Sequence, residues 1–228
     1  MATTNLKLGK GTVVEIAMLP SDSRAEPTRE ATITLGAAAS AGATSLTVTA
    51  LSSGVLIPKG SYLAFTDSND EVVLVQLDAD AEATDTTLTV IGIPADIANA
   101  ATSTYPLKLG GRTSADLGRS GNRVSSVDFD SDGYSDGLTT SIEQTITASG
   151  NFLPEDAGLR TADYAFREFR EVYVWLTLAK NSTGSTTGER WKGAASITNL
   201  PMSIPADGII TADIDITFNG KPEYSIEA

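Results

Sequence analysis

Apolar and polar residues alternate along most of the chain, which is the pattern of β-strands that bury one face. The clearest case is the segment 209–218, where every second residue is apolar and most of the residues between them are Thr or Asp. Related patterns predict a first strand over residues 12–18, a polar strand over 138–150 and a hairpin over 190–218. The sequence therefore predicts a mainly β protein.

Residues 161–180 contain the one stretch that predicts a helix, followed by the most apolar strand. Thr161 is placed to cap the helix, and Asp163 falls in its first turn. The apolar residues at helical spacing are Ala162, Ala165, Phe166 and Phe169. Residues 172–178 then alternate with period two and are apolar on both faces, so both faces should be buried. We expect a β core on one face, and the preceding helix or another chain on the other. The 190–218 hairpin should pair with this strand.

Residues 30–108 contain an internal repeat, in which the segment from Ile33 aligns with the segment from Val75. Leu46-Thr47-Val48 aligns in the same way with Leu88-Thr89-Val90. Each copy has the order strand, small-residue turn, strand. We therefore predict a small all-β module of two related halves over residues 30–108, hereafter the module.

Residues 109–127 are rich in Gly and Ser, and they carry Arg112, Arg119 and Arg123 among few apolar residues. Such a segment cannot bury enough surface to order itself. We predict that 110–127 is a flexible arm, or an arm that becomes ordered on a neighbouring molecule.

The composition excludes several classes of protein. The chain has no His and no Cys, which removes His-dependent triads, thiolate metal sites and disulfides. A net charge of −13 is unlike that of a sequence-reading nucleic-acid binder, but it suits a surface past which DNA slides. More than half of this charge lies in the module, where a solvated face is favoured over a site for a basic partner. We expect no transmembrane segment and no signal peptide.

The most specific local motif is an acidic run with the spacing of a calcium loop, formed by Asp128, Asp130, Asp132, Gly133 and Asp136. The loop's last ligand position would be Thr139 instead of the usual bidentate Glu, and strands rather than helices are predicted on either side. An acidic β-turn is the favoured interpretation. No metal ligand is therefore assigned.

Other candidate sites have simpler explanations. Glu143, Glu155 and Asp156 could serve as catalytic carboxylates, but acids just before a helix are common because of the helix dipole. The segment 9–11 (Gly-Lys-Gly) is too short for a phosphate loop. A sugar-stacking platform could be built from Tyr164, Tyr173, Trp175 and Trp191, although core or interface packing is favoured. We predict no enzyme, no catalytic residue and no cofactor.

Three stretches resemble the major tail proteins, or tail tube proteins, of tailed bacteriophages. One is the opening L-G-K-G-T-V-V-E-I, and the second runs from Val127 to Phe152 as an acidic turn leading into a polar strand. The third joins E-V-Y-V-W-L-T-L to a G-x-A-x-I-T strand, a proline-flanked bend and a last strand that ends in Phe-Asn-Gly. Residues 1–29 and 109–228 carry the resemblance, and the module departs from it.

The resemblance implies a two-sheet β-sandwich or barrel with one flanking α-helix, formed by residues 1–29 and 109–228, into which the module is inserted. It also implies six copies per ring, and rings stacked into a tube that holds the tape-measure protein and conducts DNA without reading its sequence. Other tail proteins would be partners, the location would be the virion tail after assembly in the host cytoplasm, and no membrane would be involved. We expect the module on the outer wall. The alternatives are a calcium- or carbohydrate-binding β-sandwich and, more distantly, a carboxylate-only glycosidase.

Overall fold

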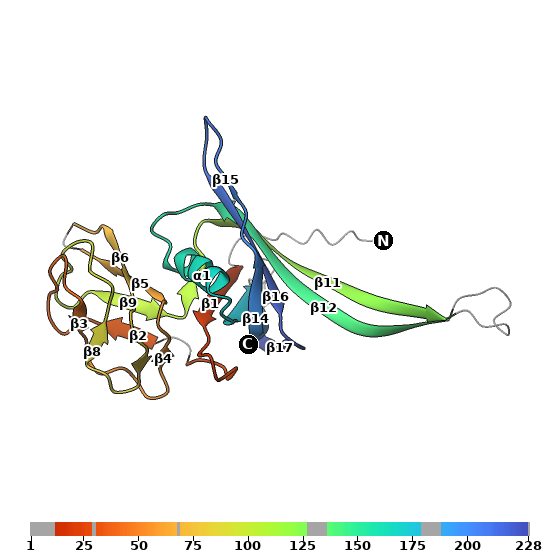
Figure 1. Ribbon diagram of the computed structural model, residues 1–228, viewed down its shortest axis with the longest axis horizontal. Helices are drawn as coiled ribbons and strands as arrows, with labels where there is room; N and C mark the ends of the chain where they lie inside the picture. Colours follow the sequence, from red (N-terminus) through yellow and green to blue (C-terminus); the bar gives the residue numbers. More distant parts are fainter. Residues whose placement is uncertain (1–11, 29–30, 68, 127–135, 179–187, 228) are drawn as a thin grey trace.

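The computed structural model describes residues 12–28, 31–67, 69–126, 136–178 and 188–227. These residues form a large antiparallel sheet, one α-helix and four two-stranded sheets (Figure 1), which confirms the mainly β fold class. The strand order of the large sheet is β10-β1-β13-β14-β16-β12-β11, with β15 paired to β16 and β17 paired to β14. Its strands are β1 Val13–Met18, β10 Leu107–Lys108, β11 Arg112–Ser126, β12 Asp136–Asn151, β13 Val172–Leu178, β14 Gly188–Asn199, β15 Met202–Ser203, β16 Thr211–Phe218 and β17 Glu223–Glu227.

Strand β13 lies between β1 and β14 and is buried on both faces, as its sequence predicts. On one face Val174 and Leu176 belong to a cluster of buried side chains that includes Ala162 and Ala165 of the helix. On the other face Trp175 belongs to a second cluster, most of which comes from the module. The cover that we expected from the helix or another chain is therefore supplied on this face mainly by the module. The module takes this place because the chain enters it after β1 and returns through β10, both in the same sheet.

The hairpin predicted over 190–218 is present, since β14 pairs with both β13 and β16. Strand β16 also confirms its predicted alternation: its buried residues are Ala212, Ile214, Ile216 and Phe218.

The helix, α1 (Ala157–Arg167), begins four residues before the predicted cap. Asp156 is the N-cap, and its Oδ1 accepts bonds from the N–H groups of Gly158 (2.9 Å) and Leu159 (3.2 Å). The assignment of Thr161 as the cap was therefore wrong: this residue is buried inside the helix, where its hydroxyl accepts a bond from Tyr62 N (2.9 Å). The assignment of Phe169 to the helix was also wrong, because the helix ends at Arg167 and Phe169 leaves its periodicity.

The strands of the module pair with one another in four small sheets. Opposite partners Leu46 and Leu88 are repeat equivalents, so an approximate two-fold axis passes between them. The backbone bonds follow this symmetry: Val48 N donates to Thr86 O, and its equivalent Val90 N donates to Thr44 O, both at 2.9 Å. The module strands are β2 Ala31–Thr34, β3 Ser45–Thr47, β4 Leu56–Ile57, β5 Tyr62–Thr66, β6 Val72–Gln76, β7 Ala81–Glu82, β8 Thr87–Thr89 and β9 Thr102–Tyr105.

The two halves of the module exchange strands. Strand β2 of the first half pairs with β9 of the second, while β6 of the second half pairs with β5 of the first. The core at the centre is filled by the repeat residues themselves. These buried residues are Ile33, Leu35, Leu46, Val48, Val75, Leu77, Leu88 and Val90.

The module is joined to the large sheet by several side chains. Gly60 has φ +91° and lies against the ring of Tyr164, where any Cβ would come within 2.0 Å of Cε1. Glu26, in the loop between β1 and β2, accepts a bond from Trp175 Nε1 (3.0 Å) and forms an ion pair with Lys192. Because these contacts join helix, sheet and loop, the module is packed onto the sheet rather than tethered to it.

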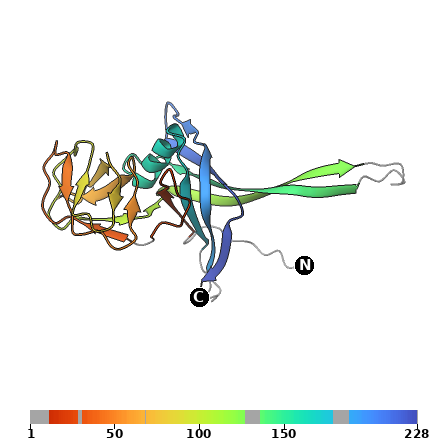
Figure 2. The same ribbon diagram turned by 60° about the horizontal axis from the view of Figure 1, so that its bottom comes forward.

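The segment 110–127 was predicted to be a flexible arm, or an arm that becomes ordered on a neighbouring molecule, and flexibility was wrong for the described residues up to Ser126. Residues Arg112–Ser126 form β11, which pairs with β12 along its length in a hairpin that projects from the sheet (Figure 2). The hairpin is ordered by backbone pairing, which Gly and Ser permit and which leaves no apolar signal in the sequence. Arg112 fixes its base by donating bonds to the carbonyl oxygens of Gly110 (2.9 Å), Asn151 (2.8 Å) and Ala212.

Candidate interaction surfaces

The outer part of the β11–β12 hairpin exposes both of its faces. Residues 118–122 of β11 and 139–143 of β12 are all exposed, whereas Ala115, Ile146 and Ala148 nearer the base are buried in the sheet. Ile142 stands on the outer part with 68% of its surface exposed. A two-stranded ribbon without a packed face is only marginally stable in water, so this part of the chain is suited to contact with another molecule.

Strand β11 also presents a free edge. It ends the strand order of the large sheet, and no other strand of the described residues pairs with its outer side. At the opposite end, β10 pairs with only Glu15 and Ile16 of β1. Unpaired edges of this length invite pairing with another strand unless they are covered.

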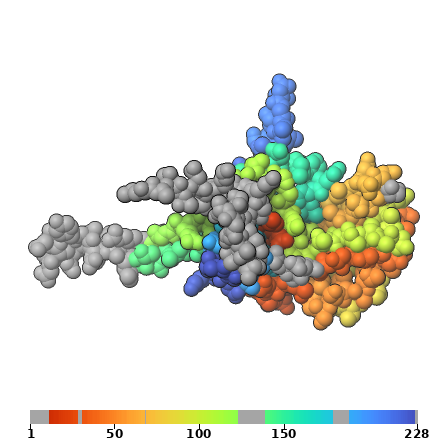
Figure 3. Space-filling model, turned by 180° about the vertical axis from the view of Figure 1, so that it is seen from behind, coloured from red at the N-terminus to blue at the C-terminus, as the bar shows by residue number. Residues whose placement is uncertain are grey.

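Residues 200–210, hereafter the finger, join β14 to β16 and project from the body of the protein (Figure 3). Apolar side chains cover it, and Met202, Ile204 and Ile209 are 44%, 69% and 67% exposed. Asp207 is its only charged residue.

Around Trp191 a second surface combines aromatic and charged side chains. Trp191 is buried and packs on the half-exposed Tyr224, with ring centroids 5.1 Å apart, and the guanidinium of Arg119 lies 5.7 Å from the Trp191 ring centre. These residues border a shallow hollow of about 440 Å³, hereafter the platform. Its lining residues are Arg119, Gln144, Glu189, Trp191, Lys221, Pro222 and Tyr224.

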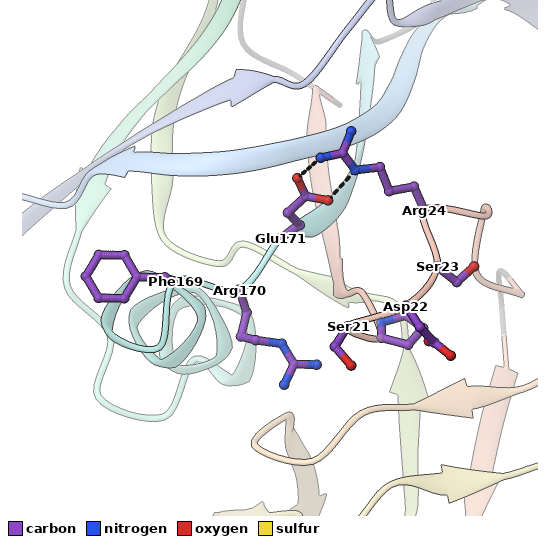
Figure 4. A pocket seen from close by; sticks show the side chains of 8 residues that line it. Ser21, Asp22, Ser23, Arg24, Phe169, Arg170 and Glu171 are labelled. Carbon is purple, nitrogen blue, oxygen red and sulfur yellow. Dashed lines mark hydrogen bonds and ion pairs between the residues drawn. The ribbon is translucent and has the colours of Figure 1, made fainter.

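A hollow of about 470 Å³ lies between the end of α1 and the loop 20–24 (Figure 4). Arg24 and Glu171 form a two-bond ion pair at its rim, and the ring of Phe169 points away from that pair. Phe169 is 95% exposed and has φ +52°, a backbone region that bulky residues rarely occupy. The exposed Phe and the ion pair suit contact with another protein better than they suit small-molecule chemistry.

The acids singled out in the sequence do not form a catalytic pair. Glu143 stands on the outer hairpin and Glu155 is exposed before the helix, whereas Asp156 is buried as its cap. Burial raises the pKa of Asp156, against the lowering effect of backbone N–H groups and of Arg112. Asp156 is thus a structural cap on a different element from Glu143.

The calcium-loop motif lies largely outside the described residues: Asp128, Asp130, Asp132 and Gly133 fall there, and only the backbone of Asp136 is described, at the start of β12. The segment 9–11 also lies outside. Within the described ranges, no three acidic side chains are grouped as a metal site would require. No described helix has the length and apolar character needed to cross a membrane.

The four aromatic residues considered as a sugar platform are mostly in the core. Tyr173, Trp175 and Trp191 are 5%, 0% and 8% exposed, so they offer no open stacking face, and the favoured interpretation of core packing is confirmed for them. Sequence analysis described the finger only as a proline-flanked bend and did not identify it, or Tyr224, as part of an interaction surface. The finger does have a signal, namely the apolar segment bracketed by Pro201 and Pro205 and followed by an Asp-Gly turn.

The sequence and the structure of the chain were compared with those of known proteins. A family model described as phage tail tube protein matches residues 96–224, which covers more than half of the chain. No curated protein matches the chain significantly. Among solved structures, the tail of an empty gene transfer agent particle, refined with C6 symmetry, has a TM-score of 0.39 at 16% identity over 50% of this chain and 82% of that chain. The virion of a native gene transfer agent particle has a TM-score of 0.42 at 14% identity over 54% and 88%. The family assignment rests on the family model.

Proposed function

The chain belongs to the phage tail tube protein family, and from this premise we propose that it is the subunit of hexameric rings that stack into the tube of the tail. The tube would hold the tape-measure protein and then conduct DNA during ejection. The role is structural, and it uses no enzymatic chemistry. The subunit would be assembled in the host cytoplasm and retained in the virion tail with other tail proteins.

The observation that carries this proposal is the β11–β12 hairpin, which is exposed on both faces and has a free edge. An isolated subunit leaves the outer part of this hairpin without a packed face and leaves the sheet open at β11. Contact with the next copy supports both features at once. Because one copy's hairpin meets a different surface on the next copy, the contact is heterologous, and heterologous contacts generate rings when the rotation closes.

The charge of the chain agrees with a conduit for DNA. The chain has a net charge of −13, and the part of it outside the module is still net negative, so a wall built from residues 1–29 and 109–228 would repel the phosphate backbone and let DNA pass without adhering. We propose that residues 1–29 and 109–228 are the tube-forming domain and that residues 30–108 are an inserted domain on the outer wall. An acidic domain placed in the lumen would obstruct DNA.

Electron microscopy of the purified protein tests the proposal directly. We expect negatively stained samples to contain rings with six-fold symmetry and stacked tubes, in amounts that rise with protein concentration. Monomers alone at every protein and salt concentration would contradict it. Class averages or a density map with the module inside the lumen would contradict its outer placement only.

Two matched variants test whether assembly depends on the hairpin in particular or on any exposed apolar side chain. Ile142 on the hairpin and Ile91 in the module are 68% and 53% exposed. We expect Ile142→Ser to reduce ring and tube formation while Ile91→Ser leaves it unchanged, with equal melting temperatures for the two monomers. Equal assembly of both variants would show that the outer hairpin is not in the contact.

A further inference from the structure

The finger and the platform lie at opposite ends of the large sheet. Figure 1 shows the finger beyond β15 at one end, and β17, which carries Tyr224, at the other. The same strand connects the two features, because β14 carries Trp191 near its start and runs into the finger after Asn199. At about 3.3 Å per residue, these two positions are separated by about 25 Å, so a chain cannot place its finger on its own platform.

The two surfaces are complementary in shape and chemistry. The finger is convex and apolar, with Pro201 and Pro205 on either side of Ile204, while the platform is a hollow with Trp191 and Tyr224 in its wall. Grooves lined by aromatic side chains are a recurrent binding surface for extended proline-containing segments. Trp191 supports the half-exposed ring of Tyr224 from behind, and burying the three exposed aliphatic side chains of the finger against Tyr224 removes apolar surface from water on both partners.

Their charges are complementary too. Asp207 is the only charged residue of the finger, and the platform contains the cations Arg119 and Lys221 with the single carboxylate Glu189. Within the described residues, Asp207 has no ion-pair partner in its own chain. A second copy can supply one in Lys221, which lies on the turn before β17.

We propose that the finger of one copy packs on the platform of a second copy of this chain. This inference rests on the proposed function and names one of its contacts. A heterologous contact generates a ring when its rotation closes and an open stack when it does not. Because the outer β11–β12 hairpin is assigned to neighbours within a ring, we assign the finger and the platform, at opposite ends of β14, to the contact between successive rings.

Disulfide trapping tests the contact, and the chain provides a clean background because it has no cysteine. Ser203 lies on the finger, and Ile226 lies two residues beyond Tyr224 and is 62% exposed. Copies carrying Ser203→Cys are mixed with copies carrying Ile226→Cys, allowed to assemble and oxidised mildly. We expect a cross-linked dimer on a non-reducing gel from the mixture and none from either variant alone. The control mixture of Ser203→Cys with Ile91→Cys, whose cysteine lies in the module, should give none.

Charge exchange gives a second measurement that needs no chemical bond. Asp207→Lys and Lys221→Asp should each raise the protein concentration needed for tubes about tenfold, and the double variant should return it toward that of the unmodified protein. Rings should persist in both single variants, and their melting temperatures as monomers should be unchanged.

The outcomes separate this contact from the function on which it rests. Tubes from the unmodified protein with no cross-link between Ser203→Cys and Ile226→Cys copies, or with unaltered assembly of both charge variants, would overturn the finger–platform contact and leave the tube proposal standing. Failure of the unmodified protein to form any assembly would overturn both.

Discussion

The module and the β11–β12 hairpin follow one another in the chain, yet they become ordered by opposite means. The module closes on itself around a core in which Leu46 and Leu88 are 0% and 1% exposed. The hairpin has almost no core beyond its base and is held by backbone pairing along β11 and β12. The difference shows that within one chain some parts are stabilised by a core of their own, whereas others depend on backbone pairing and, under the proposed function, on contact with a second copy.

Trp175 lies where the module packs on the large sheet, and its side chain is fully buried between them. We expect Trp175→Asp to abolish folding, because it places an unpaired charge in the core and leaves a large cavity. Far-UV circular dichroism and the yield of soluble protein measure the effect. Trp175→Phe is the control: it retains most of the packing and loses the bond to Glu26. Soluble Trp175→Asp protein that still forms tubes would show that this face is exposed.

Leu46→Ala tests whether the module is completed by its own core. We expect it to lower the free energy of unfolding by about 2–5 kcal/mol, and Leu88→Ala to do the same, because the two leucines are partners across the approximate two-fold axis. Chemical denaturation of the monomer measures both. The truncation Leu117→Ala on the hairpin, where the side chain is only half-buried, should cost less. A greater loss at Leu117 would reverse the comparison.

Arg112→Met tests whether the base of the hairpin depends on three charge-assisted hydrogen bonds. We expect a loss of about 2 kcal/mol, because the carbonyls of Gly110, Asn151 and Ala212 lose their donor. Hydrogen exchange should show faster exchange in β11 than in the module. Arg112→Lys keeps the charge and should recover only part of the loss. Unchanged protection in β11 would show that strand pairing alone holds the hairpin.

The smallest expected effect is the pH dependence of stability that comes from Glu26, which bonds to Trp175 and Lys192. Burial acts to raise the pKa of Glu26, but bonds from Lys192 and Trp175 outweigh it, so the pKa is below the ordinary glutamate value. A carboxylate whose pKa is lowered by folding stabilises the protein at pH values above its ordinary, unfolded pKa. This stabilisation is lost as the pH falls through the lower pKa of the folded state. Because Glu26 is partly exposed, we expect less than about 1 kcal/mol. Melting temperatures of the protein and of Glu26→Gln, compared between about pH 6 and pH 3, measure it. Parallel curves would contradict the prediction.

Side-chain periodicity predicted those parts of the fold whose order comes from burial. The alternation of Ile214 and Ile216 gave the correct face of β16, and the apolar run of β13 gave its burial on both sides. The boundaries of α1 were missed because Asp156 and Thr161 are both good caps, and tertiary packing decides between them by burying Thr161 against Tyr62.

The interaction surfaces were harder to predict for a physical reason. The Gly- and Ser-rich sequence of β11 carries no signal of strand pairing, because the bonds that order it are made by backbone atoms common to all residues. In the same way, the sequence does not distinguish the exposed Ile204 of the finger from an isoleucine in the core. Only the fold shows which apolar residues are left outside.

The exchange of strands inside the module has a consequence for how the module folds. A single repeat unit, made alone, would lack the partners of its outer strands, since β2 needs β9 and β6 needs β5. Such a unit could complete its sheets only by meeting a second molecule, at a rate and extent set by its concentration. Their connection in one chain replaces that encounter with a short covalent path, which raises the effective concentration of each half for the other. The module thus consists of two similar units in one chain, each of which supplies the strands that the other lacks.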